Sequence, residues 1–395
     1  MSRKHKHIIV GGGFGGLRVA RLLANRDDVD VIIVNPQANF EYHGSLYRSA
    51  NGTSPLETVI PYREIFADTN IEYRQDFMID IDLKAKRIKL LSGNSLDYDT
   101  VTLALGYEPE YFGIPGMREF SKTLYSLADA LELRRSLKYL AEISFHKSTP
   151  ARVIVAGGGP TGIEVAAAIP YFFELITGDR RVEVTVIEAQ QRILGALTEE
   201  FSRTVEKSLG SAISIRCGQK VIRATKQMLH IADGPSMPFD IVVWTAGSSA
   251  NSYFRQRPDL FEVDRKGRAI VDQHLQPTDK AAYVIGDSAA VQYSGTAHAA
   301  IEMGGYVAHK ISNDLAGKES SVFEPTEPAY AVPTDHVSAV AMDGPKLLAG
   351  GQGWELRRKL DLEALTLIMP EAAARSHWLS GESLANMFSP TVKRI

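Results

Sequence analysis

The sequence predicts an α/β fold of two doubly wound units with parallel sheets, the second inserted into the first, and a small C-terminal region. Short apolar runs alternate with longer helix-like stretches, as in "HIIV", "GLRVARLLANR" and "VDVIIV". The same alternation returns in "ARVIVA", "GIEVAAAI" and "VEVTVIEA". Such alternation is typical of strand–helix–strand units in a parallel sheet. Each copy also contains a glycine-rich turn after its first strand.

The bulk composition limits the number of domains and the kinds of partner. A chain of 395 residues is long enough for two or three domains, each with its own core. Lys and Arg total 44 against 47 Asp and Glu, a formal net charge of −3, so no overall positive field attracts nucleic acid. We therefore expect no nucleic-acid partner.

Cysteine content and hydropathy narrow the chemistry and the location. Cys217 is the only cysteine, which excludes an intramolecular disulfide, a CxxC redox pair and a multi-thiolate metal site. We expect no metal site, and any electron transfer would depend on a bound cofactor. No apolar run approaches the roughly 18 to 20 residues that span a bilayer. The start, "MSRKHK", leads at once into a strand-like run without a signal-peptide core, so a cytoplasmic location is expected.

The first glycine-rich turn, "HIIVGGGFGG", predicts a dinucleotide site. Gly11, Gly13 and Gly16 stand in G-x-G-x-x-G register, after a strand and at the opening of a helix that includes Phe14 and Gly15. The first glycine permits a tight turn, the second lets a pyrophosphate approach the backbone, and the third packs helix on strand. The amino terminus of the helix adds free N–H groups and a partial positive charge. The alternative is a purely structural turn.

Asn35 stands at the end of the next strand, where such units carry an acid that binds the ribose hydroxyls. An amide can bond a hydroxyl, but it lacks the charge that roughly doubles the strength of such a bond. The alternative is that Asn35 and Pro36 only turn the chain.

The second unit, "VIVAGGGPTG", repeats the motif with Gly157, Gly159, Thr161 and Gly162, and its following strand ends in Glu188. A carboxylate there accepts hydrogen bonds from a ribose diol and repels a 2′-phosphate, so NADH is expected over NADPH. Two such units predict two dinucleotides, most simply a bound flavin and a mobile nicotinamide that delivers hydride to it.

The chain order places the domains. A charged helix, "SLADALELRRSLKYLAEI", and a polar link through Ser148 lead into the second unit, and a third strand, "AAYVIGD", follows it. We therefore expect the first domain to be discontinuous. The predicted divisions are residues 1–115 and 256–325 for the two parts of the first domain, 116–255 for the second domain and 326–395 for the C-terminal region.

Longer segments carry a family resemblance. Roughly residues 7 to 320 resemble the two-dinucleotide-binding flavoproteins of the pyridine nucleotide-disulfide oxidoreductase superfamily, and among them the type II NADH dehydrogenases (NADH:quinone oxidoreductases). The segments that carry the resemblance are "NFEYHGSLYRSANGTSPLETVIPYREIF", "LALGYEPEYFGIPG", "TLYSLADALELR", "DIVVWTAGSSAN" and "DRKGRAIVDQHLQPTDKAAYVIGDSA".

The resemblance implies two cofactor sites. Residues 1–115 and 256–325 would form an FAD-binding domain and residues 116–255 an NAD(P)H-binding domain. The implied FAD contacts are Gly11, Gly13, Gly16, Asn35, the backbone near Met78, Ala104, Gly106, Gly286 and Asp287. The implied NADH contacts are Gly157, Gly159, Gly162, Glu188, Ala246 and Gly247. Relatives that reduce disulfides or oxidise sulfide use several cysteines, so a single cysteine argues against both activities.

Glu164 lies on the first turn of the second unit's helix, where the resemblance implies a glutamate directed at the flavin and nicotinamide. A carboxylate there could position the carboxamide or handle protons. The alternative is an acid that stabilises the positive end of the helix dipole.

His298 and Glu302 mark a departure from the family, which carries two glutamines by its quinone pocket at these places. Both side chains can bond a quinone oxygen, and unlike amides they can exchange the protons that quinone reduction consumes. The alternative is an i,i+4 ion pair on a helix surface. The small residues around them favour a position beside the isoalloxazine ring.

The C-terminal region is less apolar than the membrane-docking helices of that family. Leu356, Leu360, Ala364 and Leu367 fall at helical spacing beside Arg357-Arg358-Lys359, which could lie on an anionic membrane surface. Acidic residues dilute that charge, so we favour a helix in the core or in a homodimer interface. The aromatic residues Trp354, Trp378 and Phe388 are too scattered to decide the matter.

These observations predict an FAD-dependent NADH oxidoreductase that passes two electrons from NADH to an acceptor, with a quinone favoured by the resemblance. A peripheral position on the inner face of the membrane would suit that acceptor. The alternatives are an enzyme that uses a small molecule, oxygen or a protein as acceptor, and a redox-sensing flavoprotein.

Overall fold

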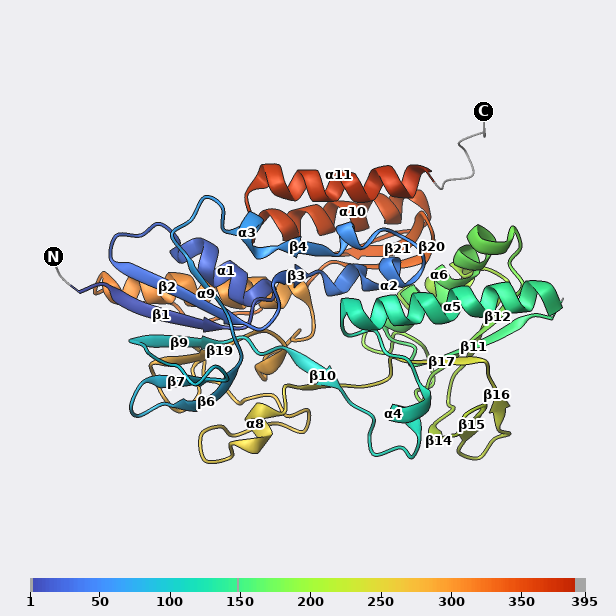
Figure 1. The fold of residues 1–395 in the computed structure, drawn as a ribbon, viewed down its shortest axis with the longest axis horizontal. Helices are drawn as coiled ribbons and strands as arrows, with labels where there is room; N and C mark the ends of the chain where they lie inside the picture. The colour runs from blue at the N-terminus through green and yellow to red at the C-terminus, as the bar shows by residue number, and fades with distance from the viewer. Residues whose placement is uncertain (1–2, 148, 388–395) are drawn as a thin grey trace.

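The computed structural model describes residues 3–147 and 149–387 and has the predicted α/β architecture with two parallel sheets (Figure 1). Ser148 of the predicted polar link and Phe388 lie outside the described residues, as does the end of the predicted C-terminal region. No helix among the described residues is long and apolar enough to cross a membrane.

The first parallel sheet has the strand order β19-β9-β1-β2-β5. Its strands are β19 (Ala282–Val284), β9 (Thr100–Leu103), β1 (His5–Val10), β2 (Val29–Asn35) and β5 (Glu72–Gln75). Helices α1 (Phe14–Leu23) and α9 (Ala297–Leu315) pack side by side on one face. Strand β19 lies in this sheet although it follows the second unit in sequence, so the second unit is inserted into the first, as predicted.

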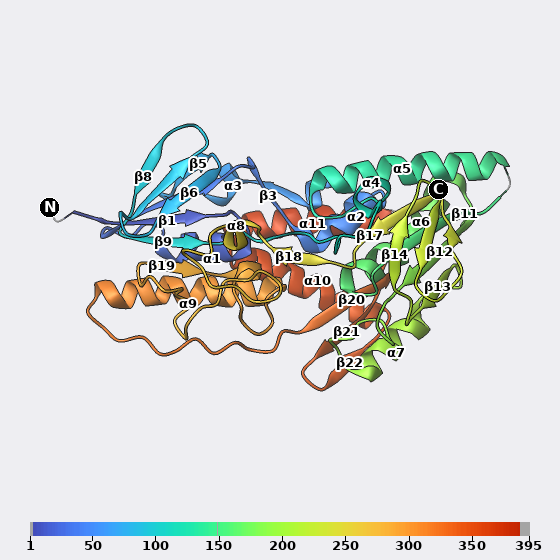
Figure 2. The ribbon, with the colours of Figure 1, turned by 90° about the horizontal axis from the view of Figure 1, so that it is seen from below.

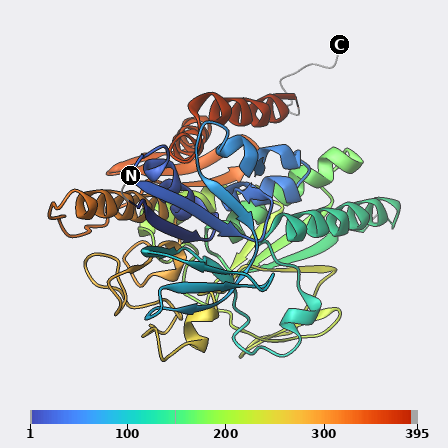
Figure 3. The ribbon, with the colours of Figure 1, turned by 60° about the vertical axis from the view of Figure 1, so that its left-hand side comes forward.

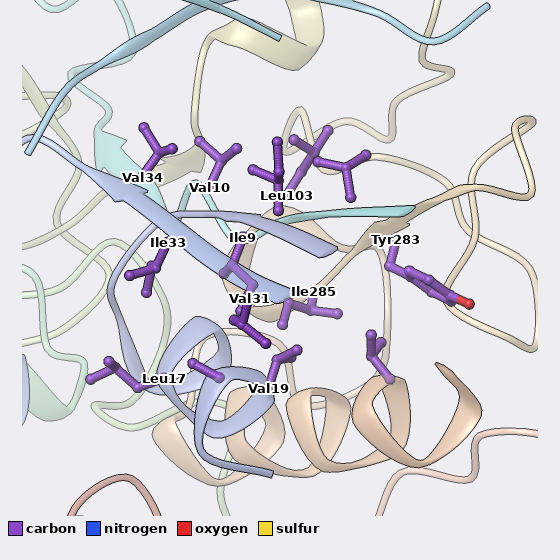
Figure 4. Close-up of a cluster of buried hydrophobic side chains, with 14 of the residues drawn as sticks. Ile9, Val10, Leu17, Val19, Val31, Ile33, Val34, Leu103, Tyr283 and Ile285 are labelled. Atoms are coloured by element: carbon purple, nitrogen blue, oxygen red, sulfur yellow. The ribbon is translucent and has the colours of Figure 1, made fainter. Parts of the chain in front are cut away.

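The strands of this sheet are apolar on both faces because both faces are covered. Ile9, Val31 and Ile33 point towards α1 and α9 (Figure 4). Val10 and Val34 point to the opposite face, where an antiparallel sheet lies, made of β6 (Met78–Asp82), β7 (Arg87–Leu90) and β8 (Ser95–Asp97).

The second parallel sheet has the order β13-β12-β11-β17. Its strands are β13 (Ile213–Arg216), β12 (Val182–Ile187), β11 (Ala151–Ala156) and β17 (Ile241–Trp244). Helices α5 (Leu127–Lys147), α6 (Pro160–Thr177) and α7 (Glu199–Ser208) cover one face of it. A small antiparallel sheet follows β13, with strands β14 (Val221–Ala224), β15 (Met228–Ile231) and β16 (Met237–Pro238).

Two antiparallel strands, β10 (Tyr107–Pro109) and β18 (Ser248–Ala250), carry the chain between the two sheets. In Figure 1, β10 runs between the halves of the molecule. Both strands lie shortly before the predicted divisions at residues 115 and 255, and we propose that the domain boundaries lie at β10 and β18. The short helices α4 (Met117–Phe120) and α8 (Tyr253–Gln256) follow the two crossings.

Shorter elements lie between β2 and β5. They are β3 (Asn39–Glu41), η1 (His43–Ser45), α2 (Leu46–Ala50), η2 (Pro55–Glu57), β4 (Val59–Pro61) and α3 (Tyr62–Ile65). Helix α2 packs against α5 and α6 of the second unit, so this segment joins the two halves of the molecule.

The C-terminal region is a three-stranded antiparallel sheet followed by two helices. It comprises β20 (Tyr330–Asp335), β21 (Ser338–Asp343), β22 (Lys346–Leu348), α10 (Gly351–Thr366) and α11 (Glu371–Met387). An extended segment leads from α9 to β20 (Figure 2), and α10 and α11 lie together on one side of the molecule (Figure 3).

The charged residues of α10 do not have the predicted orientation. Arg357, Arg358 and Asp361 are buried, and Lys359 is exposed. The row of Leu356, Leu360, Ala364 and Leu367 is only half-buried or exposed. The prediction that the basic residues could face an anionic surface was therefore wrong for Arg357 and Arg358. The prediction of a core helix is correct for α10, but charges fill its buried face because they pair there.

Candidate functional site

The two glycine-rich turns adopt matching conformations. Gly11 and Gly157 end β1 and β11 with φ angles of 110° and 122°, a region that side-chain-bearing residues rarely adopt. A Cβ on Gly11 would lie 2.1 Å from the carbonyl oxygen of Ala104, and one on Gly157 would lie 2.6 Å from the nitrogen of Ala246. Each turn therefore presses against the end of the neighbouring strand, β9 in one sheet and β17 in the other.

The second glycine of each motif borders open space. Gly13 and Gly159 are the N-caps of α1 and α6, and a Cβ on either would meet no atom within 4 Å. Since free N–H groups of a helix amino terminus point into this space, each turn forms an anion cradle that a side chain would fill. In both sheets the cradle lies at the carboxyl edge where the strand order reverses, the usual ligand site of a doubly wound sheet.

Asn35 and Glu188 occupy equivalent places. The Asn35 Oδ1 accepts a hydrogen bond from the Gly12 N–H at 3.0 Å, and a Glu188 carboxylate oxygen accepts one from the Gly158 N–H at 2.8 Å. The other Glu188 oxygen accepts from the Gln190 N–H at 2.7 Å. Asn35 thus has the position predicted for the ribose-binding residue, but its Nδ2 group already donates to Gln37 and to Tyr62.

Tyr62 is a residue of the first cradle that sequence reasoning missed. Its hydroxyl donates to the Gly12 carbonyl oxygen at 2.8 Å and accepts from Asn35. Burial raises the pKa of Tyr62 well above its usual value, so the phenol stays protonated. No local pattern marks this residue, because it reaches the cradle from α3.

The other predicted FAD contacts line the same edge of the first sheet. Met78 follows β5, whose Gln75 pairs with Asn35, and Ala104 and Gly106 follow β9. The Phe14 ring packs edge-on against Phe40 and Tyr42, and Gly15 touches α9 near Ala300. Gly286 and Asp287 lie on the short helix η3 (Gly286–Ser288).

Asp287 has an altered acidity. Its carboxylate accepts a hydrogen bond from the Gly295 N–H at 2.9 Å, yet burial raises its pKa to about 6. Tyr107 of β10 lies close enough for its own pKa to be raised by that carboxylate, in addition to the effect of burial. Asp287 therefore lies at the end of the first sheet that faces the crossing strands.

The crossing strands connect the two sheet edges. The Tyr107 ring lies 5.2 Å from the ring of Tyr125, whose hydroxyl donates to the carbonyl oxygen of Gly247 at the end of β17. On the other side, the Tyr107 hydroxyl lies 3.3 Å from Nδ1 of His43. The predicted nicotinamide-side residues Ala246 and Gly247 are thus joined to the first domain through aromatic side chains.

Glu164 belongs to a buried charge network that centres on Arg357. Glu164 lies on the second turn of α6, one turn later than predicted, and is 7 % exposed, and Arg357 of α10 donates to it at 2.6 Å. The same guanidinium donates to Asp361 at 3.0 Å, to the Ala331 carbonyl oxygen at 3.0 Å and to the Gly44 carbonyl oxygen. The network therefore unites α6, the C-terminal region and the segment that precedes α2.

Burial and the neighbouring guanidinium shift the pKa of Glu164 in opposite directions. Burial raises the pKa of Glu164, while the Arg357 guanidinium counteracts that rise. Burial and the Asp361 carboxylate raise the pKa of the Tyr42 phenol, which donates to Asp361. Sequence reasoning missed Tyr42, Arg357 and Asp361. The only local signal was the i,i+4 spacing of opposite charges in α10, which is usual on exposed helices.

His298 and Glu302 form a separate group. The His298 Nε2 lies 3.4 Å from a Glu302 oxygen and 2.9 Å from Thr326 Oγ1. Glu302 accepts from the Thr326 hydroxyl and from its N–H at 3.2 Å. The His298 side chain is 42 % exposed. The pair thus fastens the extended segment before β20 to α9, and neither member contacts Glu164 among the described hydrogen bonds and ion pairs.

Some of the small residues near His298 and Glu302 allow α9 to pack closely against its neighbours. A Cβ on Gly304 would lie 2.5 Å from the Gly15 carbonyl oxygen, so Gly304 lets α9 approach α1. Ala300 lies beside Gly15 and Gly286. The N-terminal end of α9 is therefore next to the first cradle and to η3.

Comparisons with known proteins agree with this geometry. The family model described as pyridine nucleotide-disulphide oxidoreductase matches residues 5–304. The type II NADH:quinone oxidoreductase Ndh of Mycobacterium tuberculosis is 29% identical over 382 residues, 89% of this chain and 82% of that protein. The demethylphylloquinone reductase NdbB of Synechocystis is 26% identical over 387 residues, 91% of this chain and 90% of that protein.

Solved structures share the fold. NDH2 of Plasmodium falciparum, solved in complex with NADH, has a TM-score of 0.84 at 18% identity and covers 99% of this chain and 100% of its own. The sulfide:quinone oxidoreductase of Aquifex aeolicus has a TM-score of 0.77 at 18% identity, covering 93% and 92%. Because the family model spans both cradles and the insertion between them, the chain belongs to the pyridine nucleotide-disulphide oxidoreductase family.

Proposed function

We propose that this protein is an FAD-dependent NADH oxidoreductase that passes two electrons to a quinone. The observation that carries the proposal is the pair of equivalent cradles, one in each sheet, joined at their carboxyl edges by β10 and β18. The names of the relatives, which are NADH:quinone and demethylphylloquinone reductases, support the substrates. With one cysteine in the sequence, disulfide chemistry within the chain is excluded.

The residues of the first cradle fit FAD. The open space at Gly13 admits a pyrophosphate, and the segment from β5 to Met78 borders the place of the adenine. Asp287 is half-buried at the end of the sheet that faces the crossing strands. When bound, FAD supplies the two-electron chemistry that links a hydride donor to a quinone.

The second cradle fits NADH. Gly159 leaves room for its pyrophosphate, and Glu188 stands where it accepts hydrogen bonds from the ribose and repels a 2′-phosphate. The nicotinamide end would extend towards Gly247 and Tyr125. Glu164 lies on the same helix, and in this role its carboxylate holds a proton near the reacting groups while Arg357 fixes its orientation.

A paired substitution tests the cradle assignment. Gly13 and Gly159 have φ angles of −80° and −76°, which valine adopts without strain, so each valine would fill only its cradle. We expect Gly13→Val to be purified without yellow flavin while it still binds NADH. We expect Gly159→Val to retain flavin while NADH bleaches it far more slowly.

The measurements are the absorbance of bound flavin, NADH affinity by calorimetry, and anaerobic bleaching with NADH and NADPH. A parent protein that binds no added FAD would sink the proposal. The acceptor is then identified by timing flavin reoxidation with quinones, oxygen and protein acceptors, and faster reoxidation by oxygen than by every quinone would replace the quinone assignment.

For His298 and Glu302 we propose a role in acceptor choice. They lie at the end of α9 that is next to the first cradle, and both side chains can exchange protons. The double variant His298→Gln/Glu302→Gln should change the relative rates of reoxidation by the acceptor panel. Unchanged rates for every acceptor would reduce the pair to an anchor for Thr326.

We also propose peripheral contact with the inner face of the membrane through α11 and η2. These elements pack together, and Leu56 and Leu379 on them are 69% and 54% exposed. Exposed leucines on neighbouring elements suit insertion at a lipid interface. A homodimer that buries the same leucines is the alternative arrangement.

A further inference from the structure

A small cavity lies beside Glu164. Its volume is about 30 Å³. One wall is a stripe of α6 that includes Glu164, Ala168 and Tyr171, and the others are α2 with its following turn and the β20–β21 turn. We call it the α6 cavity.

The volume of the α6 cavity limits which molecules it can hold. A cavity needs only about 10 to 15 Å³ by this measure to hold one water molecule. Its volume of about 30 Å³ therefore suits about two water molecules and excludes a quinone.

Asn51, in the cavity wall, has an acceptor atom that a water molecule could satisfy. Asn51 is 6% exposed, and its Nδ2 donates to the Tyr47 carbonyl oxygen at 2.7 Å. Its Oδ1 has no hydrogen-bond partner among the described residues. A buried acceptor without a partner costs about 1 to 3 kcal/mol, which a cavity water that reached this atom would recover.

The cavity reaches from Glu164 to the surface. Tyr171 stands seven positions after Glu164 on α6, about 10 Å along the helix axis. Its ring stacks on the imidazole of His336, with centroids 4.1 Å apart. Asp335, next in the lining, has a side chain that is 47% exposed. His336 thus stands at the outer end and Glu164 at the inner end.

We propose that the α6 cavity is the proton intake of this enzyme, in which His336 takes a proton from solvent and cavity waters pass it to Glu164. The inference rests on the proposed function. NADH supplies two electrons and one proton as hydride, and reduction of a quinone to a quinol takes two electrons and two protons. Each turnover, NADH + H⁺ + quinone → NAD⁺ + quinol, therefore draws one proton from solvent.

The charged groups along the α6 cavity favour transfer of a proton through a titratable side chain. Arg357 and Asp361 of α10, Tyr42, and Tyr47 and Arg48 of α2 face Glu164 or the cavity. Tyr171, Asp335 and Glu174 with Arg180 surround His336. Because the Arg48 guanidinium disfavours a free hydronium ion in the cavity, a group that binds and releases one proton at a time is favoured at the outer end.

The central test compares the two half-reactions of the holoenzyme with His336→Gln. Flavin reduction by NADH takes no solvent proton, so its stopped-flow rate should match the parent. Reoxidation by a short-chain quinone should slow by about a hundredfold above pH 7, at the lower end of proton-transfer effects. The slowed step should show a larger solvent isotope effect and should recover when imidazole is added, which a purely structural role of His336 would not produce.

His377 offers a matched control. It lines a smaller cavity of about 10 Å³ that reaches Asp361 but whose lining does not include Glu164. His377→Gln should therefore reoxidise like the parent. If His377→Gln slows reoxidation and His336→Gln does not, protons enter by the other cavity and the proposal fails.

Ala168→Val tests the waters without removing a titratable group. The added methyl groups fill part of the cavity, so reoxidation should slow while NADH reduction stays unchanged. A high-resolution crystal structure should show a water on Asn51 Oδ1 in the parent and none in this variant. A dry cavity in the parent, or normal reoxidation in both His336→Gln and Ala168→Val, overturns the proposal. A parent that NADH does not reduce refutes the proposed function instead.

Discussion

Asn35 and Glu188 show how the same position can hold different chemistry. Both accept a hydrogen bond from the backbone N–H of the glycine-rich turn, so each fixes the shape of its cradle. Glu188 adds a charge that favours a ribose diol, whereas the Asn35 amide is also bonded to Gln37 and Tyr62. We propose that this carboxylate sets the preference for NADH over NADPH.

Replacement of Glu188 by alanine should weaken NADH more than NADPH. Loss of charged hydrogen bonds to the ribose should raise the KM for NADH roughly 10- to 100-fold, while NADPH loses a repulsion and changes less. The ratio of kcat/KM for the two cofactors measures this effect. Glu183→Ala, an exposed change on the same strand, is the control. Equal losses for both cofactors would show that Glu188 does not face the ribose.

His7 predicts a pH dependence of stability. It is fully buried in β1 between Thr100 and Thr102, and burial lowers its pKa to about 3 from the usual 6.5. Below pH 6.5 the unfolded chain binds a proton at this residue that the folded protein does not, so acid favours unfolding. Between pH 6 and pH 4 this contribution should cost about 1.4 kcal/mol per pH unit.

The His7 contribution is isolated by comparing the pH dependence of two proteins. Urea unfolding of the parent and of His7→Asn should give curves of unfolding free energy whose difference shrinks as the pH falls. His309→Gln, an exposed change on α9, should leave the slope unchanged. Parallel curves for the parent and His7→Asn would contradict a neutral buried imidazole.

Among the elements, α10 departs most from what its sequence suggests. Leucines at helical spacing beside basic residues favoured an apolar inner face and a charged outer face. The structure buries Arg357 and Asp361 because they bond to partners from α6, β3–η1 and β20. Arg358 is buried where it donates to the Trp378 carbonyl oxygen of α11. Glu164 and Arg357 are 193 residues apart in sequence, so no pattern within α10 could reveal the pairing.

Arg357→Met should therefore destabilise the protein by about 3 to 5 kcal/mol, because it leaves Glu164 and Asp361 buried without their cation. Denaturant unfolding at pH 7 measures the loss, and Lys359→Met on the exposed face is the control. Burial already raises the pKa of Glu164, and loss of the guanidinium raises it further. The loss should thus be smaller in acid than at pH 8, because protonation of Glu164 removes one of the unpaired buried charges. A loss below about 1 kcal/mol would mean that water solvates these groups.

The glycine-rich turns represent the opposite case. Their geometry depends on neighbours within a few residues and on the ends of adjacent strands, so the spacing of Gly11, Gly13 and Gly16 was enough to predict the cradle. The same holds for Gly157, Gly159 and Gly162. Tyr62 and Thr326 were missed because each reaches its partners from a separate element.

At the scale of the whole molecule, the fold class and the insertion of the second unit followed from the order of strands and helices. Residues joined by packing between distant segments did not follow. The network of Tyr42, Glu164, Arg357 and Asp361 joins the segment after β3, helix α6 and helix α10. Sequence reasoning placed Glu164 on the right helix but one turn too early, and it could not supply its partners.

Membrane contact is testable on the intact protein. Leu56→Ser/Leu379→Ser should weaken co-sedimentation with anionic vesicles by about tenfold, since each buried leucine side chain contributes about 1.5 to 3 kcal/mol when fully buried and less when partly inserted. Leu91→Ser, which changes a leucine of equal 69% exposure on the β7 side, is the matched control. A parent that does not bind vesicles, and that sediments as a dimer dispersed by the double change, would favour the homodimer.

The buried charges of α10 limit which segments can be replaced by those of a relative in a chimera. A chimera that takes residues beyond β19 from another family member would keep Glu164 and lose the guanidinium that neutralises it. The acquired helix would then have to bring its own cation to the same point, or the recombinant would carry a buried carboxylate without a counter-ion. Helices α6 and α10 should therefore be exchanged together, although they are far apart in the sequence.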